Sequence, residues 1–328
     1  MNKFARILAI AIALLIITPY IVAAWMESPV DVAFRSQAPG QFVTLTNGET
    51  HYRWLGEETG EIVVLVHGLS VPNYIFAQTA AALTGSGYRV LLFDQFGHGF
   101  SDRPTARYDA DFFDLQMIEL FDQLELTEPV IIGALSMGGI VAVEFTTRHA
   151  GRVKSLMLFA PAGLRLVNES DSSFVKMLKL PFLGHWMWRI VGHQYYAQAR
   201  SHEKTNAEIQ SGESMQGDPA LQANHQGYLM AIRQIFRFFP LHHRDDLFAK
   251  IGQLQVPVLG IFGDNDSTIN LASAELLADL IPDARIEVLA GGTHHLNIHR
   301  WRDVHEIVLS FLRRNNAGVE TDLDSDLD

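Results

Sequence analysis

The sequence predicts a mostly parallel, doubly wound α/β sheet that is interrupted by an all-helical insertion and preceded by a hydrophobic helix. Three observations lead to this prediction. Short apolar runs typical of buried strands alternate with helical patterns along most of the chain. This rhythm stops over residues 164–251 and then resumes, and residues 7–26 form one long uncharged stretch. Buried strands separated by helices pair in parallel through right-handed crossovers.

Composition excludes several classes of protein. With 328 residues, 48% of them hydrophobic and 19% charged, the chain can bury a large core. Its net charge of −12 argues against a nucleic-acid partner, because phosphate binding needs a basic surface. It has no cysteine, which excludes a thiol nucleophile and any disulfide. Residues 317–328 carry an acid at nearly every second position and are predicted to form an acidic, disordered tail.

The N-terminal segment, residues 1–27, is predicted to be a membrane anchor. Lys3 and Arg6 precede an uncharged stretch of about the ~20 residues that span a bilayer as a helix. This positive flank places the rest of the chain on the non-cytoplasmic side. The alternative is a signal segment cleaved before Trp25, which would export the protein. The position at the start of the chain disfavours a buried core helix.

The first part of the α/β core is predicted over residues 28–163. A period-2 pattern that turns at Asn47-Gly48 indicates a hairpin. Continuous apolar runs then alternate with amphipathic ones. The expected strands cover 61–68, 88–97, 129–136 and 153–163, and the expected helices cover 77–83, 110–126 and 138–150.

The insertion over residues 164–251 is predicted to form a helical cap, because its aromatic and basic clusters have helical spacing and it lacks a convincing strand. The second part of the core follows over residues 252–316. Its strands and the loops after them are expected at 256–266 and 284–295, and its helices at 270–282 and 300–314.

The segment "VIIGALSMGG" raises the question of whether Ser136 is a nucleophile. It follows a buried strand and precedes a helix, at the sheet edge where α/β folds bind ligands. A sharp turn there needs small residues on both sides, which Ala134 and Gly138 provide, and it directs the NH of Met137 toward an oxyanion. A serine that caps the helix fits the same pattern about equally well.

A base and an acid for this serine would lie on later loops. "FGDND" supplies Asp264 and Asp266 after one strand, and "GGTHH" supplies His294 and His295 after the next. A serine needs a base to take its proton, and that base needs an acid to orient it. The chain order serine, aspartate, histidine is the order that α/β enzymes with a nucleophile elbow use.

The segments "LVHGLS", "FDQFGHGFSD", "GALSMGG", "FGDND" and "GGTHH" together resemble the successive core motifs of the α/β-hydrolase superfamily. The resemblance covers roughly residues 40–163 and 252–314. It implies that Ser136 is the nucleophile, Asp266 the acid and His294 the base, with His295 as the fallback because Thr293 replaces the usual glycine. It also implies that the NH groups of Leu69 and Met137 form an oxyanion hole. A serine at the elbow excludes an aspartate nucleophile.

The predicted function is hydrolysis of carboxylic esters with hydrophobic acyl groups, as in a carboxylesterase or monoacylglycerol lipase. Carbon–carbon bond hydrolysis or acyl transfer on the same triad is one alternative. A non-catalytic binding protein of the same fold is another. The expected partners are a small hydrophobic ester and, through the N-terminal segment, a membrane. No cofactor and no metal is predicted, because the histidine pairs lack a third ligand at suitable spacing. The sequence indicates no particular oligomeric state.

Overall fold

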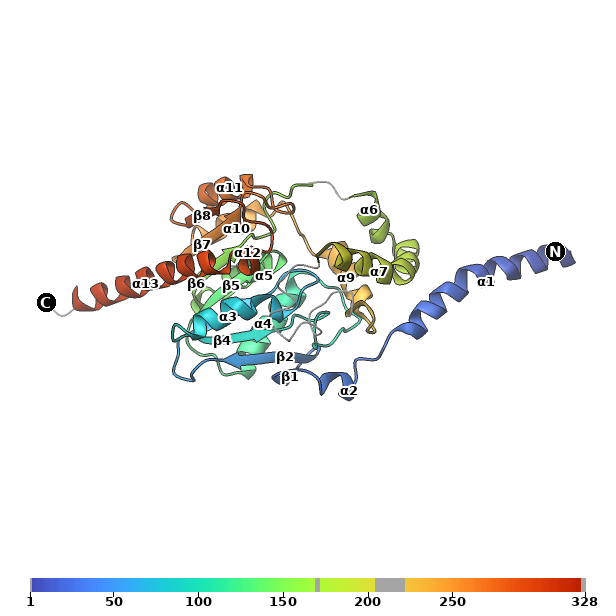
Figure 1. Ribbon diagram of the computed structural model, residues 1–328, viewed down its shortest axis with the longest axis horizontal. Coiled ribbons are helices and arrows are strands. Elements are labelled where there is room, and N and C mark those ends of the chain that lie inside the picture. Colours follow the sequence, from blue (N-terminus) through green and yellow to red (C-terminus); the bar gives the residue numbers. More distant parts are fainter. Residues whose placement is uncertain (1, 169–171, 204–221, 326–328) are drawn as a thin grey trace.

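The computed structural model describes residues 2–168, 172–203 and 222–325, and one eight-stranded sheet lies at its centre (Figure 1). The strand order is β1-β2-β4-β3-β5-β6-β7-β8. β1 and β2 form the predicted antiparallel hairpin, β2 pairs antiparallel with β4, and all later pairs are parallel. The prediction of a mostly parallel sheet is confirmed. The strands are β1 (Gln41–Leu45), β2 (Gly48–Leu55), β3 (Ile62–Val66), β4 (Arg89–Phe93), β5 (Val130–Leu135), β6 (Val153–Phe159), β7 (Val258–Gly263) and β8 (Arg285–Leu289).

The central strands are apolar throughout because helices cover both faces of the sheet. Every residue of β5 is buried, and so is every residue of β7. Strands that are covered on both sides need no polar face, so their sequences read as continuous runs of Val, Ile, Leu and Phe.

The helices of the core fall into two groups, and the members of each group pack against one another. α3 contacts α12 and α13, whereas α5 contacts α4 and α10, and α10 contacts α11. Their bounds are α3 (Ala77–Thr84), α4 (Ala110–Gln123), α5 (Met137–Arg148), α10 (Asp245–Ile251), α11 (Ala272–Leu280), α12 (Leu296–His299) and α13 (Trp301–Ser325). Short helices that the sequence pattern did not predict are α2 (Val32–Arg35), α12 and the 3-10 turns η1 (Asn73–Phe76) and η2 (Ala150–Arg152).

Of the helices that the structure describes between β6 and β7, three form the cap. α6 (Ser173–Lys179), α7 (Pro181–Glu203) and α9 (Tyr228–Phe238) pack on one another beside the sheet (Figure 1). α10 also lies within the range predicted for the insertion, but it contacts α5 and α11 of the core. The division of the chain into domains otherwise stays a prediction, and residues 169–171 and 204–221 of the predicted cap lie outside the described residues.

The N-terminal segment is one long helix, α1 (Lys3–Met26), which projects from the cap side of the molecule (Figure 1). The side chain of Asn2 caps it by accepting a hydrogen bond from the NH of Ala5 at 2.8 Å. Most of its apolar side chains are exposed. Within the described residues, α1 is the one helix that is long and apolar enough to cross a membrane.

The last helix differs from the sequence prediction. α13 continues to Ser325, through most of the segment predicted as a disordered tail, and it extends away from the sheet at the end opposite α1 (Figure 1). Residues 326–328 lie outside the described residues.

Candidate active site

Ser136 lies on a tight turn between β5 and α5. Its backbone has φ 52° and ψ −119°, a conformation that L-residues seldom adopt. A Cβ on Gly138 would lie 2.4 Å from the carbonyl oxygen of Val66, so no larger residue fits there without displacing the end of β3. Ala134 is fully buried on the other side of the turn. The local geometry is therefore that of a strained strand-to-helix elbow.

The hydroxyl of Ser136 does not cap the helix that follows it. No side-chain hydrogen bond joins it to the first turn of α5. Its Oγ instead lies 3.1 Å from Nε2 of His294. Of the two interpretations that the sequence left open, the geometry favours a serine placed beside a base.

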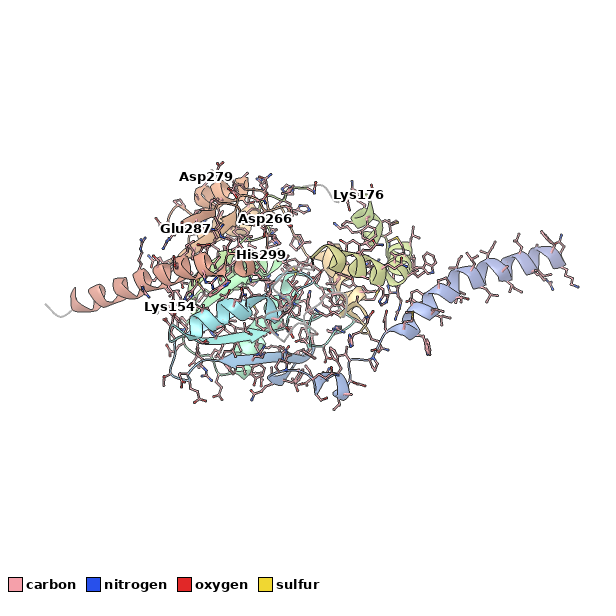
Figure 2. The ribbon with its side chains drawn as sticks, in the orientation of Figure 1. Lys154, Lys176, Asp266, Asp279, Glu287 and His299 are labelled. Carbon is pink, nitrogen blue, oxygen red and sulfur yellow. The ribbon has the colours of Figure 1, made fainter. Side chains whose placement is uncertain are left out.

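Asp266 and His294 meet at the carboxyl edge of the sheet. Asp266 lies on the loop after β7 (Figure 2), and His294 lies on the loop after β8. Nδ1 of His294 is 2.9 Å from Oδ2 of Asp266. The carboxylate is 2% exposed and the imidazole 16% exposed, so the pair is screened from water while the ring stays accessible. The loops after three strands thus bring serine, histidine and aspartate into one chain of contacts.

The carboxylate of Asp266 is held in its ionised form. Oδ1 accepts hydrogen bonds from the NH groups of Thr268 at 2.7 Å and Ile269 at 2.9 Å. Burial acts to raise the pKa of Asp266, but the bond and charge of His294 together with these two NH groups hold it below its usual value. Because both Asp266 oxygens accept, Nδ1 of His294 carries the proton, which leaves Nε2 free to accept one from Ser136.

Asp264 and His295, the alternative acid and base from the sequence, do not take part in this chain of contacts. Asp264 is exposed, and its Oδ1 accepts a hydrogen bond from the NH of Gly291 at 2.6 Å, so it ties two loops together. The ring of His295 lies 5.6 Å from that of His294, tilted by 59°, and among the described residues it makes no hydrogen bond to Ser136 or Asp266. Burial, followed by the charges of His294 and His299, lowers the pKa of His295 to about 4.

The loop after β3 closes over Ser136. A Cβ on Gly68 would lie 3.2 Å from the Cβ of Ser136, so the two backbones approach closely. No hydrogen bond among the described residues occupies the NH of Leu69 or of Met137. Met137 follows Ser136 directly, and Leu69 follows Gly68, so both predicted oxyanion donors belong to segments that adjoin the serine, and their role in catalysis stays a prediction.

Two buried histidines hold this loop in place. The NH of Gln95 donates to Nε2 of His67 at 2.9 Å, and the NH of Ser70 donates to Nε2 of His98 at 3.2 Å. Burial lowers the pKa of both rings, to about 3 in His98, where the charge of His67 adds to the effect. Both imidazoles are therefore neutral at pH 7 and able to accept these bonds. The contacts of His67 thus order the loop.

Tyrosines of the cap also bind this loop, which the sequence pattern did not reveal. The hydroxyl of Tyr196 on α7 lies 2.9 Å from Oγ of Ser70, and that of Tyr228 on α9 donates to the carbonyl of Ser70 at 3.3 Å. Ser70 itself has a left-handed φ of 66°. These contacts could not be predicted, because helical periodicity shows that one face of a cap helix is buried and does not show which segment buries it.

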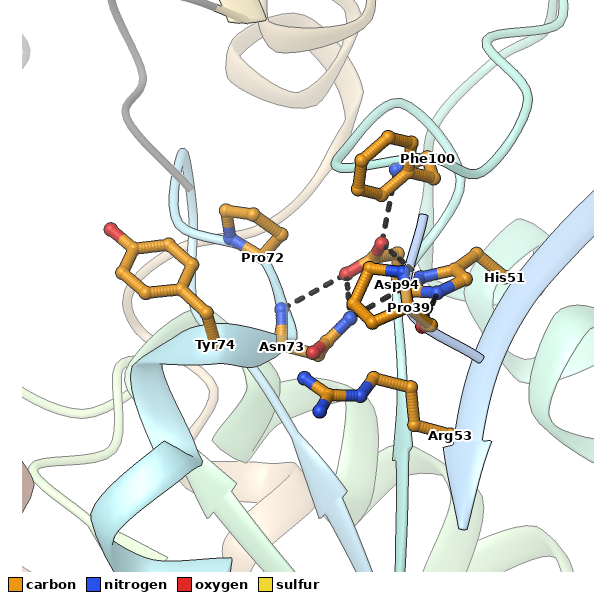
Figure 3. Close-up of a pocket in the computed structure, with 8 residues that line it drawn as sticks. All are labelled: Pro39, His51, Arg53, Pro72, Asn73, Tyr74, Asp94 and Phe100. Carbon is orange, nitrogen blue, oxygen red and sulfur yellow. Dashed lines mark hydrogen bonds and ion pairs between the residues drawn. The ribbon is translucent and has the colours of Figure 1, made fainter. Parts of the chain in front are cut away.

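A hollow beside β4 is separate from this site. Figure 3 shows Asp94 at its centre, accepting from the NH groups of Asn73 and Phe100 and paired with His51 at 2.8 Å. Burial acts to raise the pKa of Asp94, but the charge and hydrogen bond of His51 lower it to about 2. Ser101 donates to the Asp94 carbonyl at 2.6 Å and accepts from the NH of His51 at 2.9 Å, so its hydroxyl joins two neighbouring segments. The residues around this hollow brace the turns that carry the active-site loops.

Fold and loops together define an α/β-hydrolase. A solved enol-lactonase from Burkholderia xenovorans LB400 shares the fold, with a TM-score of 0.67 and 24% identity over 83% of this chain and 100% of that one. The family described as Serine aminopeptidase, S33 matches residues 57–299, and the chain belongs to this family.

Proteins related in sequence are named for several different activities. A non-heme haloperoxidase of Rhodococcus erythropolis is 28% identical over 83% of this chain and 98% of its own length. Lipase 3 of a Moraxella species is 25% identical over 74% of this chain and 75% of its own length. Relatives of this similarity share a family while differing in reaction, so the substrate must be argued from the site.

Proposed function

We propose that the protein is a serine hydrolase that cleaves carboxylic esters of hydrophobic acyl groups through an acyl-enzyme intermediate. The observation that carries the proposal is the chain of contacts from Ser136 Oγ to His294 Nε2 at 3.1 Å and from His294 Nδ1 to Asp266 Oδ2 at 2.9 Å. A serine hydroxyl is a poor nucleophile until a base takes its proton, and this arrangement supplies the base and its orienting acid.

In the proposed reaction, Oγ of Ser136 attacks the ester carbonyl while Nε2 of His294 takes its proton. The NH groups of Leu69 and Met137 stabilise the oxyanion, and each such donor is worth about 3 kcal/mol in the transition state. His294 then gives the proton to the departing alcohol. Water, deprotonated by the same nitrogen, attacks the acyl carbon, and the acid leaves as the proton returns to Ser136. Asp266 keeps Nδ1–H in place throughout.

The cap supports an apolar acyl group as the substrate. Its buried aromatic side chains include Trp188, Tyr196 and Tyr228, and the last two contact the loop beside Ser136. A cap with this aromatic composition beside Ser136 suits an apolar group better than a charged one. The names of the lipase and enol-lactonase relatives point the same way. The family description adds an aminopeptidase as the competing activity.

The test is a panel of p-nitrophenyl esters of increasing acyl length. Aminoacyl p-nitroanilides are assayed alongside them for peptidase activity, and a dienoic acid is assayed for carbon–carbon bond hydrolysis. We expect ester turnover that rises with chain length and falls at least about 1000-fold in Ser136→Ala. A fluorophosphonate probe should label the native chain and not this variant. Ester turnover that survives in Ser136→Ala would refute the mechanism, and turnover confined to another arm would replace the substrate class.

We further propose that α1 stays attached and anchors the chain, with the catalytic domain on the non-cytoplasmic side. Tyr20 supports retention, because its hydroxyl lies 2.8 Å from Nε2 of His185 in the cap and a cut before Trp25 would remove it. Intact-mass measurement of the protein from membranes should give the uncleaved N-terminus. A mature chain that begins at Trp25 would favour export instead.

A further inference from the structure

α1 and the cap helix α7 lie side by side and run in the same direction. Trp186 Nε1 donates to the carbonyl of Ile16 at 2.7 Å and Tyr20 OH lies 2.8 Å from His185 Nε2, so this part of α1 faces residues 185 and 186. Glu27, which follows α1, pairs with Arg189 at 2.8 Å and lies 4.0 Å from Nε2 of His193, so the residue numbers rise together along the two helices.

This pairing sets the depth of the cap relative to a membrane that contains α1. Ile16 precedes Met26 by ten residues, about 15 Å along a helix, and the hydrocarbon core of a bilayer is about 30 Å thick. The contact between Trp186 and Ile16 therefore lies below the headgroups. Phe182 precedes Trp186 by one turn of α7. Because the two helices run in the same direction, Phe182 lies at least as deep below the membrane surface as Trp186.

The turn between α6 and α7 has the side chains that such a position requires. Residues 180–183, which we call the cap corner, are Leu, Pro, Phe and Leu, and all four are exposed. Phe182 is 90% exposed, Leu183 51% and Leu180 47%. Runs of exposed apolar residues are rare on surfaces that face water.

Two backbone carbonyl groups of the cap corner are hydrogen-bonded within the protein. A turn that enters hydrocarbon must have its carbonyl groups satisfied internally. The guanidinium of the buried Arg233 donates to the carbonyl of Leu180 at 2.5 Å and to that of Pro181 at 2.9 Å. The NH of Leu180 donates to the carbonyl of Met177 at 3.1 Å.

We propose that the cap corner inserts into the leaflet that α1 crosses on the side of the catalytic domain, so that the phospholipid bilayer is a second binding partner of the cap. This inference rests on the proposed anchoring by α1. It gives the cap a fixed position on the membrane, with α7 rising from the acyl chains toward Glu27 at the surface. A hydrophobic ester could then pass from lipid to the cap without crossing water.

The chain has no native cysteine, so single cysteines can report the depth of chosen side chains. Ile12→Cys on α1, Leu183→Cys in the cap corner and Tyr195→Cys near the other end of α7 would each carry an NBD fluorophore. Leu183 and Tyr195 are matched in exposure, at 51% and 50%, and lie on the same helix. The full chain is reconstituted in phosphatidylcholine–phosphatidylglycerol vesicles, with and without brominated acyl chains.

We expect brominated lipid to quench the probes at positions 12 and 183 at least twofold more than the probe at 195, with blue-shifted emission at the first two. Quenching at 12 while 183 behaves like 195 would overturn the insertion of the cap corner and leave the anchor standing. A probe at 12 that is not quenched would overturn the anchor, and the insertion with it.

Discussion

Asp266→Asn is expected to abolish most ester hydrolysis without unfolding the protein, because the substitution changes the proton on His294 rather than the shape of the site. In the native site, Oδ2 of Asp266 accepts from Nδ1–H of His294, and Oδ1 accepts from two backbone NH groups. An asparagine has the same shape but only one accepting oxygen. It can satisfy one of these two sets of donors and not both.

The distances decide which set the asparagine keeps. If its oxygen faced His294, its NH2 group would face the NH groups of Thr268 and Ile269, now at 2.7 and 2.9 Å, and both donors would lose their acceptor. Thr268 is exposed and can bond to water, but the NH of the buried Ile269 would be left unpaired at a cost of about 1–3 kcal/mol. The other orientation keeps both bonds and places NH2 against Nδ1, which forces the proton of His294 onto Nε2. That nitrogen then donates toward Ser136 and cannot act as its base.

The expected result is a fall in kcat/KM of about 1000-fold to 10,000-fold, which corresponds to about 4–5.5 kcal/mol in the barrier. The assay is p-nitrophenyl ester hydrolysis, with urea unfolding to show that the fold is intact. Asp264→Asn is the matched control on the same loop, and it should stay within about threefold of the native rate, because Asp264 only ties the loop to Gly291. An Asp266→Asn protein that retains a tenth of the native activity, or equal losses in both variants, would refute this reasoning.

Three further predictions follow from the structure. His294→Gln should lose ester hydrolysis about 1000-fold, whereas His295→Gln should stay within a few-fold; loss confined to the second variant would show that the base is misassigned. Gly138→Ala should lower the free energy of unfolding by about 1–3 kcal/mol, because its Cβ meets backbone at 2.4 Å, while Gly151→Ala, with no atom within 4 Å, should not; equal stabilities in urea would contradict this. Asp94→Asn should cost about 2 kcal/mol at pH 7, because a native pKa of about 2 against an ordinary 3.8 stabilises the fold only where the carboxylate is ionised. The difference from the native chain should therefore shrink as the pH falls from 4 toward 2, and a constant difference in urea unfolding across this range would argue against it.

Much of the fold could be predicted because its strands are covered on both faces. Burial on both sides makes β3, β5, β6 and β7 read as apolar runs, and the parallel arrangement places their following loops at one edge. The closeness of Ser136, Asp266 and His294 follows from that topology, since each lies on the segment that follows a parallel strand. Short elements such as α12 could not be predicted, because four residues make little more than one helical turn, too few to show a periodic pattern.

Contacts between the cap and the core could not be predicted. α10 lies within the range predicted for the cap and packs on the core, because the apolar pattern of a helix shows that one face is buried and not which neighbour buries it. The bonds of Tyr196 and Tyr228 to Ser70 are hidden for the same reason. Asp264 and Asp266 follow the same strand, and only the path of the loop distinguishes them.

The bend at Ser136 also has a consequence for how such a chain evolves. A residue with a side chain in this backbone conformation lowers the stability of the fold by about 1–3 kcal/mol, and glycine would relieve most of that strain. Selection for a durable fold alone would therefore replace the serine. A lineage that loses the need for the hydroxyl should drift toward glycine at this position and become more stable as it does so. Under the proposed function, serine stays at position 136 because its hydroxyl is needed, although glycine would suit the backbone conformation better.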